Sequence, residues 1–262
     1  MAKTVLSISS QVAFGPVGNS AAVPAMEALG MTVYAVPTTV LSHHPGHAKP
    51  AGVQIPADVL AAMLESLLAL GVLDRLAAVM TGYFVADDQI FSVARVIRQL
   101  KERSPELLYL CDPVIGAETL NLYVSLPVAE AVKSSLLPLA DVITPNAFEL
   151  EWLSAIPVRS IDDVRKARLK LCAKSVIAKS VPKGQDRLLT VLTGALGETA
   201  IETARRKDVP HGTGDLLSGL FLANLLEGSD GPSALQRSVG LLEKTIDLSA
   251  GGSALDLSGL RQ

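Results

Sequence analysis

Short apolar runs alternate with amphipathic stretches along the first two thirds of the chain. Six of the runs predict β-strands, at Thr4–Ser9, Thr32–Val36, Ala77–Met80, Leu107–Cys111, Asp141–Thr144 and Ser175–Ala178. Helices are predicted between them, near residues 20–29, 58–69, 86–103, 128–136, 147–154 and 161–172. This alternation is typical of βαβ units, and it predicts a mostly parallel sheet covered by helices.

The pattern changes after Lys179. Two strands, Leu188–Leu192 and Thr199–Thr203, follow each other without a helix between them, which predicts an antiparallel edge. Two further helices are predicted near 215–226 and 233–248. Because neither a linker nor an internal repeat divides the sequence, we expect one domain over residues 1–262.

Several predicted helix ends have a residue type suited to that position. Gly30 and Gly71 follow helical patterns and fit the left-handed position after a helix. Asp58 and Ser160 are placed as N-caps, and Ser160 with Asp163 has the spacing of a capping box.

The composition fits this architecture and excludes several classes of function. Hydrophobic residues make up 49% of the chain and aromatic residues only 4%, so the core is built from aliphatic side chains, as in helix-covered parallel sheets. A net charge of −3 gives no basic surface for nucleic acid or for an anionic membrane. The start, MAKTVLSISS, is too polar for a signal peptide, and no apolar run reaches the ~20 residues that span a bilayer. We therefore expect a cytoplasmic protein.

Polar residues follow each of the six predicted strands. They are Ser10 and Gln11, then Thr38 and Thr39, then Thr81, Gly82 and Tyr83, then Asp112, then Thr144 and Asn146, and finally Lys179. In an open parallel sheet, ligands bind beyond the carboxyl ends of the strands. The six clusters therefore predict a binding site at that edge.

The stretch HGTGDLLSGLFLANLL places a glycine turn directly before an apolar helix. The first amides of such a helix lack intrahelical partners and lie at its positive end, so an anion binds there. Gly212, Thr213 and Gly214 would form the anion hole, and Asp215 places a carboxylate beside it. One reading makes Asp215 a simple N-cap. The other makes it a general base that deprotonates a hydroxyl while the amides stabilise a transferred phosphoryl group.

Two familiar nucleotide-binding motifs are missing. The sequence contains no G-x-x-x-x-G-K-[ST], and the spacing of GPVGNSA does not fit a dinucleotide fingerprint. The segment TPNAFELE offers Asn146 and Glu149 three residues apart at a helix start, either as a helix cap or as oxygen donors to Mg²⁺. Asp112 could supply a further oxygen ligand.

Three of the four histidines, His43, His44 and His47, lie in one loop rich in proline and glycine. A zinc site is one interpretation. A polar loop in which one histidine hydrogen-bonds a bound ring is the interpretation we favour.

Together these motifs resemble the ribokinase-like superfamily and, within it, the vitamin B6 kinases that phosphorylate pyridoxal. The resemblance runs from about residue 5 to 228 and is carried by SSQVAFGPVGNSAA, GY at 82–83, CDPVIG, ADVITPNAFELEWL and HGTGDLLSGLFLANLLEG. It implies a three-layer α/β/α sandwich and transfer of the γ-phosphate of ATP to the 5′-hydroxyl of pyridoxal, pyridoxine or pyridoxamine. It also implies Mg²⁺, raises a monovalent cation as a second ion, and implies a homodimer.

The resemblance assigns roles to individual positions. Asp215 corresponds to the catalytic base and the Gly212–Gly214 turn to the anion hole. Nucleotide- and metal-side positions correspond to Asp112, Thr144, Glu149 and Lys179, of which Asp112 and Glu149 are the metal candidates. The substrate side corresponds to Ser10, His44, Pro45, Gly46 and Tyr83, and segment 115–125 corresponds to a flap over the nucleotide.

Departures from the family pattern fall on the substrate side. Pro45 stands where a substrate-contacting threonine is usual, and Val85 stands where a glycine is usual. Two alternatives therefore stay open: a hydroxymethylpyrimidine kinase of thiamin synthesis, and a non-catalytic protein that binds vitamin B6.

Overall fold

A computed structural model describes residues 2–260 and contains a nine-stranded sheet in the order β11-β10-β9-β8-β5-β4-β1-β2-β3. The strands are β1 Thr4–Phe14, β2 Thr32–His43, β3 Gly52–Gln54, β4 Leu76–Thr81, β5 Leu108–Cys111, β8 Val142–Ile143, β9 Ser175–Lys183, β10 Arg187–Gly194 and β11 Thr199–Ala204. The six central strands are parallel, whereas β3, β10 and β11 run antiparallel to their neighbours. A separate hairpin joins β6 (Gly116–Ala117) to β7 (Asn121–Leu122).

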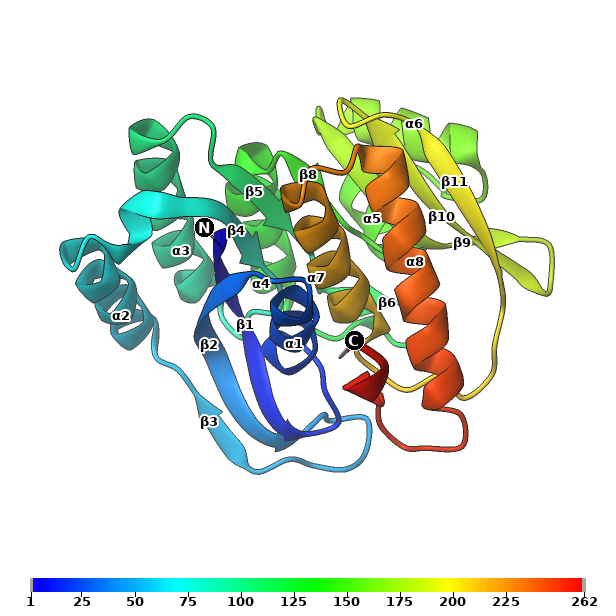
Figure 1. Cartoon of the computed structure of the whole chain (residues 1–262), viewed down its shortest axis with the longest axis horizontal. Coiled ribbons are helices and arrows are strands. Elements are labelled where there is room, and N and C mark those ends of the chain that lie inside the picture. The colour runs from blue at the N-terminus through cyan, green and yellow to red at the C-terminus, as the bar shows by residue number, and fades with distance from the viewer. Residues whose placement is uncertain (1, 261–262) are drawn as a thin grey trace.

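Helices cover both faces of this sheet (Figure 1). They are α1 Asn19–Ala28, α2 Ala57–Ala69, α3 Asp87–Arg103, α4 Leu126–Ala131, α5 Ala147–Ser154, α6 Ile161–Lys170, α7 Thr213–Leu226 and α8 Gly231–Leu248, with short helical turns at Val72–Arg75, Val132–Leu136, Leu137–Leu139 and Leu257–Leu260. Helix α7 lies across the middle of one face, beside α1 and α8. Helices α2 to α6 pack on the other face.

Alternation along the strands divides the core in two. Successive residues of a strand point to opposite faces, so Val5 packs with α1, α7 and α8 while Leu6 packs with α2 to α6. In the same way, Leu110 packs with α1, α7 and α8, and Tyr109 packs with α2 to α6. The predicted three-layer α/β/α sandwich with a mostly parallel sheet is confirmed, as is its antiparallel edge.

Strands β1 and β2 are longer than predicted. Both continue beyond the first polar residues and stay paired as far as Phe14 and His43. The sequence pattern did not show this because the extension carries polar residues between its apolar ones. Strands β3, β6 and β7 were not predicted, since two or three residues are too few for a periodic pattern.

Most of the predicted helix ends are confirmed. Gly30 and Gly71 have positive φ angles of 80° and 70°, and Ser160 accepts a hydrogen bond from the Asp163 amide. The prediction that Asp58 caps α2 was wrong, because the N-cap is Pro56 and Asp58 lies in the first turn. Asp163 accepts from the amide of Arg159, so the expected capping box is only half formed.

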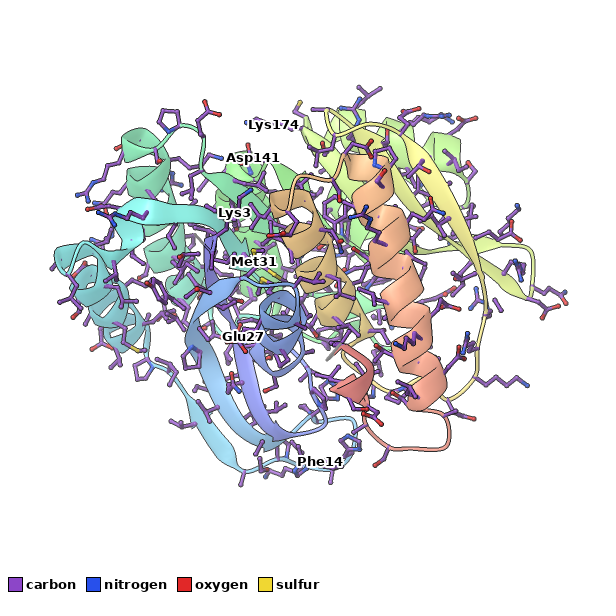
Figure 2. All side chains as sticks on the ribbon, viewed as in Figure 1. Lys3, Phe14, Glu27, Met31, Asp141 and Lys174 are labelled. Atoms are coloured by element: carbon purple, nitrogen blue, oxygen red, sulfur yellow. The ribbon has the colours of Figure 1, made fainter. Side chains whose placement is uncertain are left out.

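Different residues lie at the amino ends and at the carboxyl ends of the parallel strands. Lys3, Asp141 and Lys174 lie where strands begin, and Phe14 lies at the opposite edge, where β1 ends (Figure 2). An ion pair of 2.7 Å joins Lys174 Nζ to Asp141 Oδ1 at the first edge. The predicted site residues lie at the second edge. Among the helices of residues 2–260, none has both the length and the apolar character that crossing a bilayer requires.

Candidate active site at the carboxyl edge of the sheet

Helix α7 begins at the glycine turn that the sequence singled out. Gly212 is its N-cap, with φ at +98°, and a Cβ atom there would lie 2.0 Å from the Pro16 carbonyl oxygen. Only glycine therefore fits this position. Asp215 is the third residue of the helix, so the interpretation of Asp215 as an N-cap was wrong.

The Asp215 carboxylate is only partly exposed and lies among glycine backbones. It accepts a hydrogen bond from the Gly18 amide, and a Cβ atom on Gly82 would lie 3.9 Å from Asp215 Oδ1. Burial, followed by the negative charge of Asp112, raises the pKa of Asp215 to about 6. A carboxylate with a pKa in this range can accept a proton near neutral pH.

A buried polar network lies beside this turn. Lys179 Nζ donates to both oxygens of Asp112, at 2.8 and 3.0 Å. Ser218 Oγ donates to Asp112 Oδ2 at 2.9 Å and lies 2.9 Å from Thr144 Oγ1. The network joins the residues that follow β5 and β8, and Lys179 in the middle of β9, to the first turns of α7. It therefore fixes Asp112, Thr144 and Lys179 next to Asp215.

Asn146 and Glu149 form a complete capping box at the start of α5. Asn146 Oδ1 accepts from the Glu149 amide at 2.9 Å, and Glu149 Oε2 accepts from the Asn146 amide at 2.8 Å. The Asn146 side chain also donates to the Gly116 carbonyl, so the structure favours the cap over the ligand for Asn146. Glu149 Oε1 accepts from the Ile115 amide, and burial raises the pKa of Glu149. Its part in metal binding stays a prediction.

Ser10 and Tyr83 lie near Asp215, because each is next to a glycine that approaches its carboxylate. Ser10 is buried, and a Cβ atom on Gly18 would lie 2.2 Å from Ser10 Oγ, so Ser10 contacts the same turn that donates to Asp215. The backbone of Tyr83 is held at both ends, because its amide donates to Ser9 Oγ at 3.0 Å and its carbonyl accepts from Thr38 Oγ1 at 2.7 Å. Burial raises the pKa of the half-buried Tyr83 phenol.

The loop that carries His44, Pro45 and Gly46 is joined to the segment before α7 by a contact between two histidine rings, which are tilted by 33°. The rings of His44 and His211 lie 4.2 Å apart between centroids, although 167 positions separate them in the chain. Burial, followed by the proximity of His211 and His47, lowers the pKa of His44 to about 4. Within residues 2–260, no group of three or more His, Cys, Asp or Glu is arranged to hold a metal ion, so the geometry gives the zinc interpretation no support.

Three further residues belong to the site although the sequence did not single them out. Ser218 lies one turn after Asp215, and this helical spacing was the signal that could have found it. Gly18 has a φ of 55° and supplies an amide to Asp215. Tyr123 lies in the 115–125 segment with 43% of its surface exposed, and partial desolvation, followed by the charges of Glu149 and Asp215, raises its pKa.

Comparisons with known proteins agree with this geometry. A model of the phosphomethylpyrimidine kinase family matches residues 14–255. Pyridoxal kinase PdxY of Vibrio campbellii is 34% identical over 239 residues, which cover 88% of this chain and 83% of that protein. The resemblance to vitamin B6 kinases that the motifs indicated is confirmed by this relative.

Solved structures show the same fold. Pyridoxal kinase from Entamoeba histolytica superposes with a TM-score of 0.91 at 24% identity, covering 98% of this chain and 93% of that one. Pyridoxal kinase from Leishmania donovani in complex with ADP and pyridoxine superposes with a TM-score of 0.88 at 28% identity, covering 98% and 91%. By fold, by the family model and by its relatives, the chain belongs to the phosphomethylpyrimidine kinase family, alongside the pyridoxal kinases.

Proposed function

We propose that this chain is an ATP-dependent kinase that transfers the γ-phosphate to the 5′-hydroxyl of pyridoxal, with pyridoxine and pyridoxamine as further substrates. The observation that carries the proposal is the Asp215 carboxylate, which lies partly exposed in the first turn of α7, beside the Gly212–Gly214 turn. The pyridoxal kinase names of the relatives support the same substrate class.

Asp215 and the glycine turn have complementary tasks in this proposal. Asp215 takes the proton of the substrate hydroxyl as the oxygen attacks the γ-phosphorus. The unpaired amides of Gly212, Thr213 and Gly214 hold the oxygens of the transferred group. Because both are fixed by one helix start, attacking oxygen and phosphoryl group meet in a defined geometry.

The residues present fit a divalent cation. Asp112 and Glu149 are buried oxygen donors, and they lie close enough that the charge of Asp112 adds to burial, the larger cause, in raising the pKa of Glu149. Mg²⁺ usually binds through one or two carboxylates, with substrate phosphates and water completing its shell. Asp112, with Glu149 through water, would hold it. The ion would neutralise phosphate charge, and Thr144 and Lys179 would lie on the same nucleotide side.

The substrate ring is assigned to the opposite side of Asp215. Ser10, Tyr83 and the loop His44–Pro45–Gly46 would contact it, with Pro45 removing the hydroxyl contact that a threonine would supply. The single domain and the cytoplasmic location, which the sequence led us to expect, and the homodimer, which the resemblance implies, stay proposals.

The proposed base predicts an acid limb in the pH–rate profile. Asp215 is active only when deprotonated, and its pKa is about 6, so kcat/KM should fall as the pH drops below about 6. The profile is measured with pyridoxal, pyridoxine and pyridoxamine in turn. If kcat/KM falls at the same pH with all three substrates, the titrating group is on the enzyme. If that pH changes with the vitamer, the fall cannot be assigned to Asp215.

The second candidate is a hydroxymethylpyrimidine kinase, because the matching family model carries that chemistry in its name. We expect an ADP-release screen to show highest turnover with a B6 vitamer, and pyridoxal to win when both substrates compete. Preference for the pyrimidine would replace the first proposal by the second. Binding of B6 vitamers without ADP release would favour the non-catalytic alternative.

A further inference from the structure

The Asn19 side chain is buried, and both of its polar atoms make hydrogen bonds. Asn19 is the first residue of α1 and is 1% exposed. Its Oδ1 atom accepts from Ser7 Oγ at 2.8 Å, and its Nδ2 atom donates to the carbonyls of Ser9 and Val36, each at 3.3 Å. One side chain therefore joins α1 to both β1 and β2. A buried polar group whose partners are present in this way fixes the local geometry.

The two strands need these hydrogen bonds at this point. Ser9 is paired with Pro37 in the parallel register of β1 and β2, and proline has no N–H to donate. The register then shifts between Ser9 and Gln11, so the ladder is irregular directly after this pair. The Asn19 amide group donates to one carbonyl on each strand beside the interruption. It therefore holds β1 and β2 together where backbone pairing alone is incomplete.

Gly18, the residue before Asn19, contacts the proposed base. Its amide donates to the Asp215 carboxylate. Gly18 is the N-cap of α1, with φ at 55° and ψ at −133°, and its carbonyl accepts from the Ala22 amide at 2.9 Å. A Cβ atom on Gly18 would lie 2.2 Å from Ser10 Oγ, so Gly18 packs directly on the strand irregularity. The start of α1 and this irregularity thus set the direction of the Gly18 N–H bond.

Helix α7 packs against α1 at close range. A Cβ atom on Gly219 would lie 2.9 Å from the Ala22 carbonyl oxygen and 3.0 Å from the Ala22 Cα atom, so the two backbones approach without a side chain between them. Gly219 lies one helical turn after Asp215. This packing sets how far Asp215 lies from Gly18, and the bonds of Asn19 set how the Gly18 amide is turned.

We propose that Asn19 is a positioning residue for phosphoryl transfer, whose side chain orients the Gly18 amide toward Asp215 and so holds the carboxylate in place for the substrate hydroxyl. The inference rests on the proposed kinase function. The hydrogen bonds of the Asn19 side chain go to the strands, so its effect on Asp215 passes through Gly18. Without that side chain, the Gly18 amide is free to turn away. The carboxylate then loses a donor that favours its charged form.

The first arm of the test compares Asn19→Ala with the wild type in steady-state kinetics. We expect kcat with pyridoxal to fall by about 10–10²-fold, because a displacement of about 1 Å at a reacting group can cost 10²-fold. KM for ATP should stay within about threefold, because binding that is equal in the ground state and the transition state is untouched.

Asn224→Ala is the matched control for loss of a buried amide. Asn224 is 6% exposed, and its Nδ2 atom donates to the Leu220 carbonyl at 2.9 Å and to Ser238 Oγ at 3.2 Å, near the other end of α7. This variant should lose stability and keep its kcat. Equal losses of kcat in Asn19→Ala and Asn224→Ala would overturn the proposal.

The second arm measures the pH dependence of kcat/KM. The hydrogen bond from Gly18 lowers the pKa of Asp215, so loss of that bond raises it. Since Asp215 acts deprotonated, kcat/KM should start to fall about half a pH unit or more higher in Asn19→Ala than in the wild type. Asp112 and Lys179, whose charges also act on the pKa of Asp215, are unchanged in this variant. An acid limb that does not move would show that Asn19 serves only the fold.

A third arm observes the Gly18 amide by NMR, without catalysis. Asp215→Ala removes the acceptor and so defines the proton chemical shift of the unbonded Gly18 amide. This resonance should move toward that value in Asn19→Ala and stay at the wild-type value in Asn224→Ala. An unchanged resonance in Asn19→Ala would contradict the proposal. If the wild type releases no ADP with any vitamer, the kinase function fails by itself, and the chemical shift still decides whether Asn19 orients Gly18.

Ser7→Ala decides the question if Asn19→Ala does not fold. It removes one of the three hydrogen bonds of the Asn19 side chain and leaves the two to the strand carbonyls. We expect smaller changes in the same direction in kcat, in the acid limb and in the Gly18 resonance. If none of the three changes, the proposal is wrong.

Discussion

Replacing Asp215 by asparagine should lower kcat by about 10²–10⁴-fold, the range that general acid–base catalysis contributes. Asparagine has nearly the same shape and can still accept the hydrogen bond from the Gly18 amide, but it cannot take a proton from the attacking hydroxyl. ATP affinity should be retained, because the glycine turn and Lys179 are unchanged. Steady-state kinetics with pyridoxal and direct titration with ATP measure the two quantities.

The fold should not suffer from this change. The raised pKa of Asp215 means that the folded state disfavours the charged carboxylate, so a neutral side chain keeps or slightly increases the free energy of unfolding at neutral pH. Asp186→Asn, at an exposed position between β9 and β10, is the control for loss of one charge. A rate for Asp215→Asn close to that of the wild type would remove Asp215 from the role of base.

Gly212→Ala should abolish most of the activity, with a loss of at least about 10²-fold, because a shift of about 1 Å in positioning costs that much. The new Cβ atom would lie 2.0 Å from the Pro16 carbonyl oxygen, a distance that the backbone can relieve only by moving the turn. The φ angle of +98° adds strain for any residue with a side chain. Turnover and chemical denaturation of the variant measure the two consequences.

Gly228→Ala separates strain from displacement. Gly228 has nearly the same φ angle, +97°, but no atom lies within 4 Å of the Cβ position that an alanine would add. It follows the other end of α7, away from the turn. This control should lose about 1 kcal/mol of stability and keep its turnover. Equal activity losses in the two glycine variants would show that the Gly212 turn has no special part in catalysis.

The glycine turn was predictable because its signal is local. A sequence of two glycines and an aspartate directly before a long apolar run contains the helix start, the unpaired amides and the carboxylate within four residues. The same holds for the strands of the parallel sheet, since burial on both faces leaves continuous apolar runs. Asp112 and Lys179 could be placed at the carboxyl edge for the same reason, as residues that follow such runs.

The choice between two uses of one side chain was not predictable. Asn146 and Glu149 have the spacing of a cap and of a ligand pair, and only the structure shows that the cap forms and that Gly116 and Ile115 make further hydrogen bonds to the two side chains. Asp215 was likewise open between cap and base until the helix start at Thr213 placed it in the first turn.

The sequence by itself therefore determined the strand and helix order, the edge of the sheet that carries polar groups, and the chemistry of the turn before α7, because each depends on residues close together in the chain. Only the tertiary structure decided that Lys179 pairs with Asp112, that Ser218 joins Asp112 to Thr144, and that the His44 ring contacts the His211 ring. These contacts join residues 67 or more positions apart, and hydrophobic periodicity carries no information about which distant side chains meet.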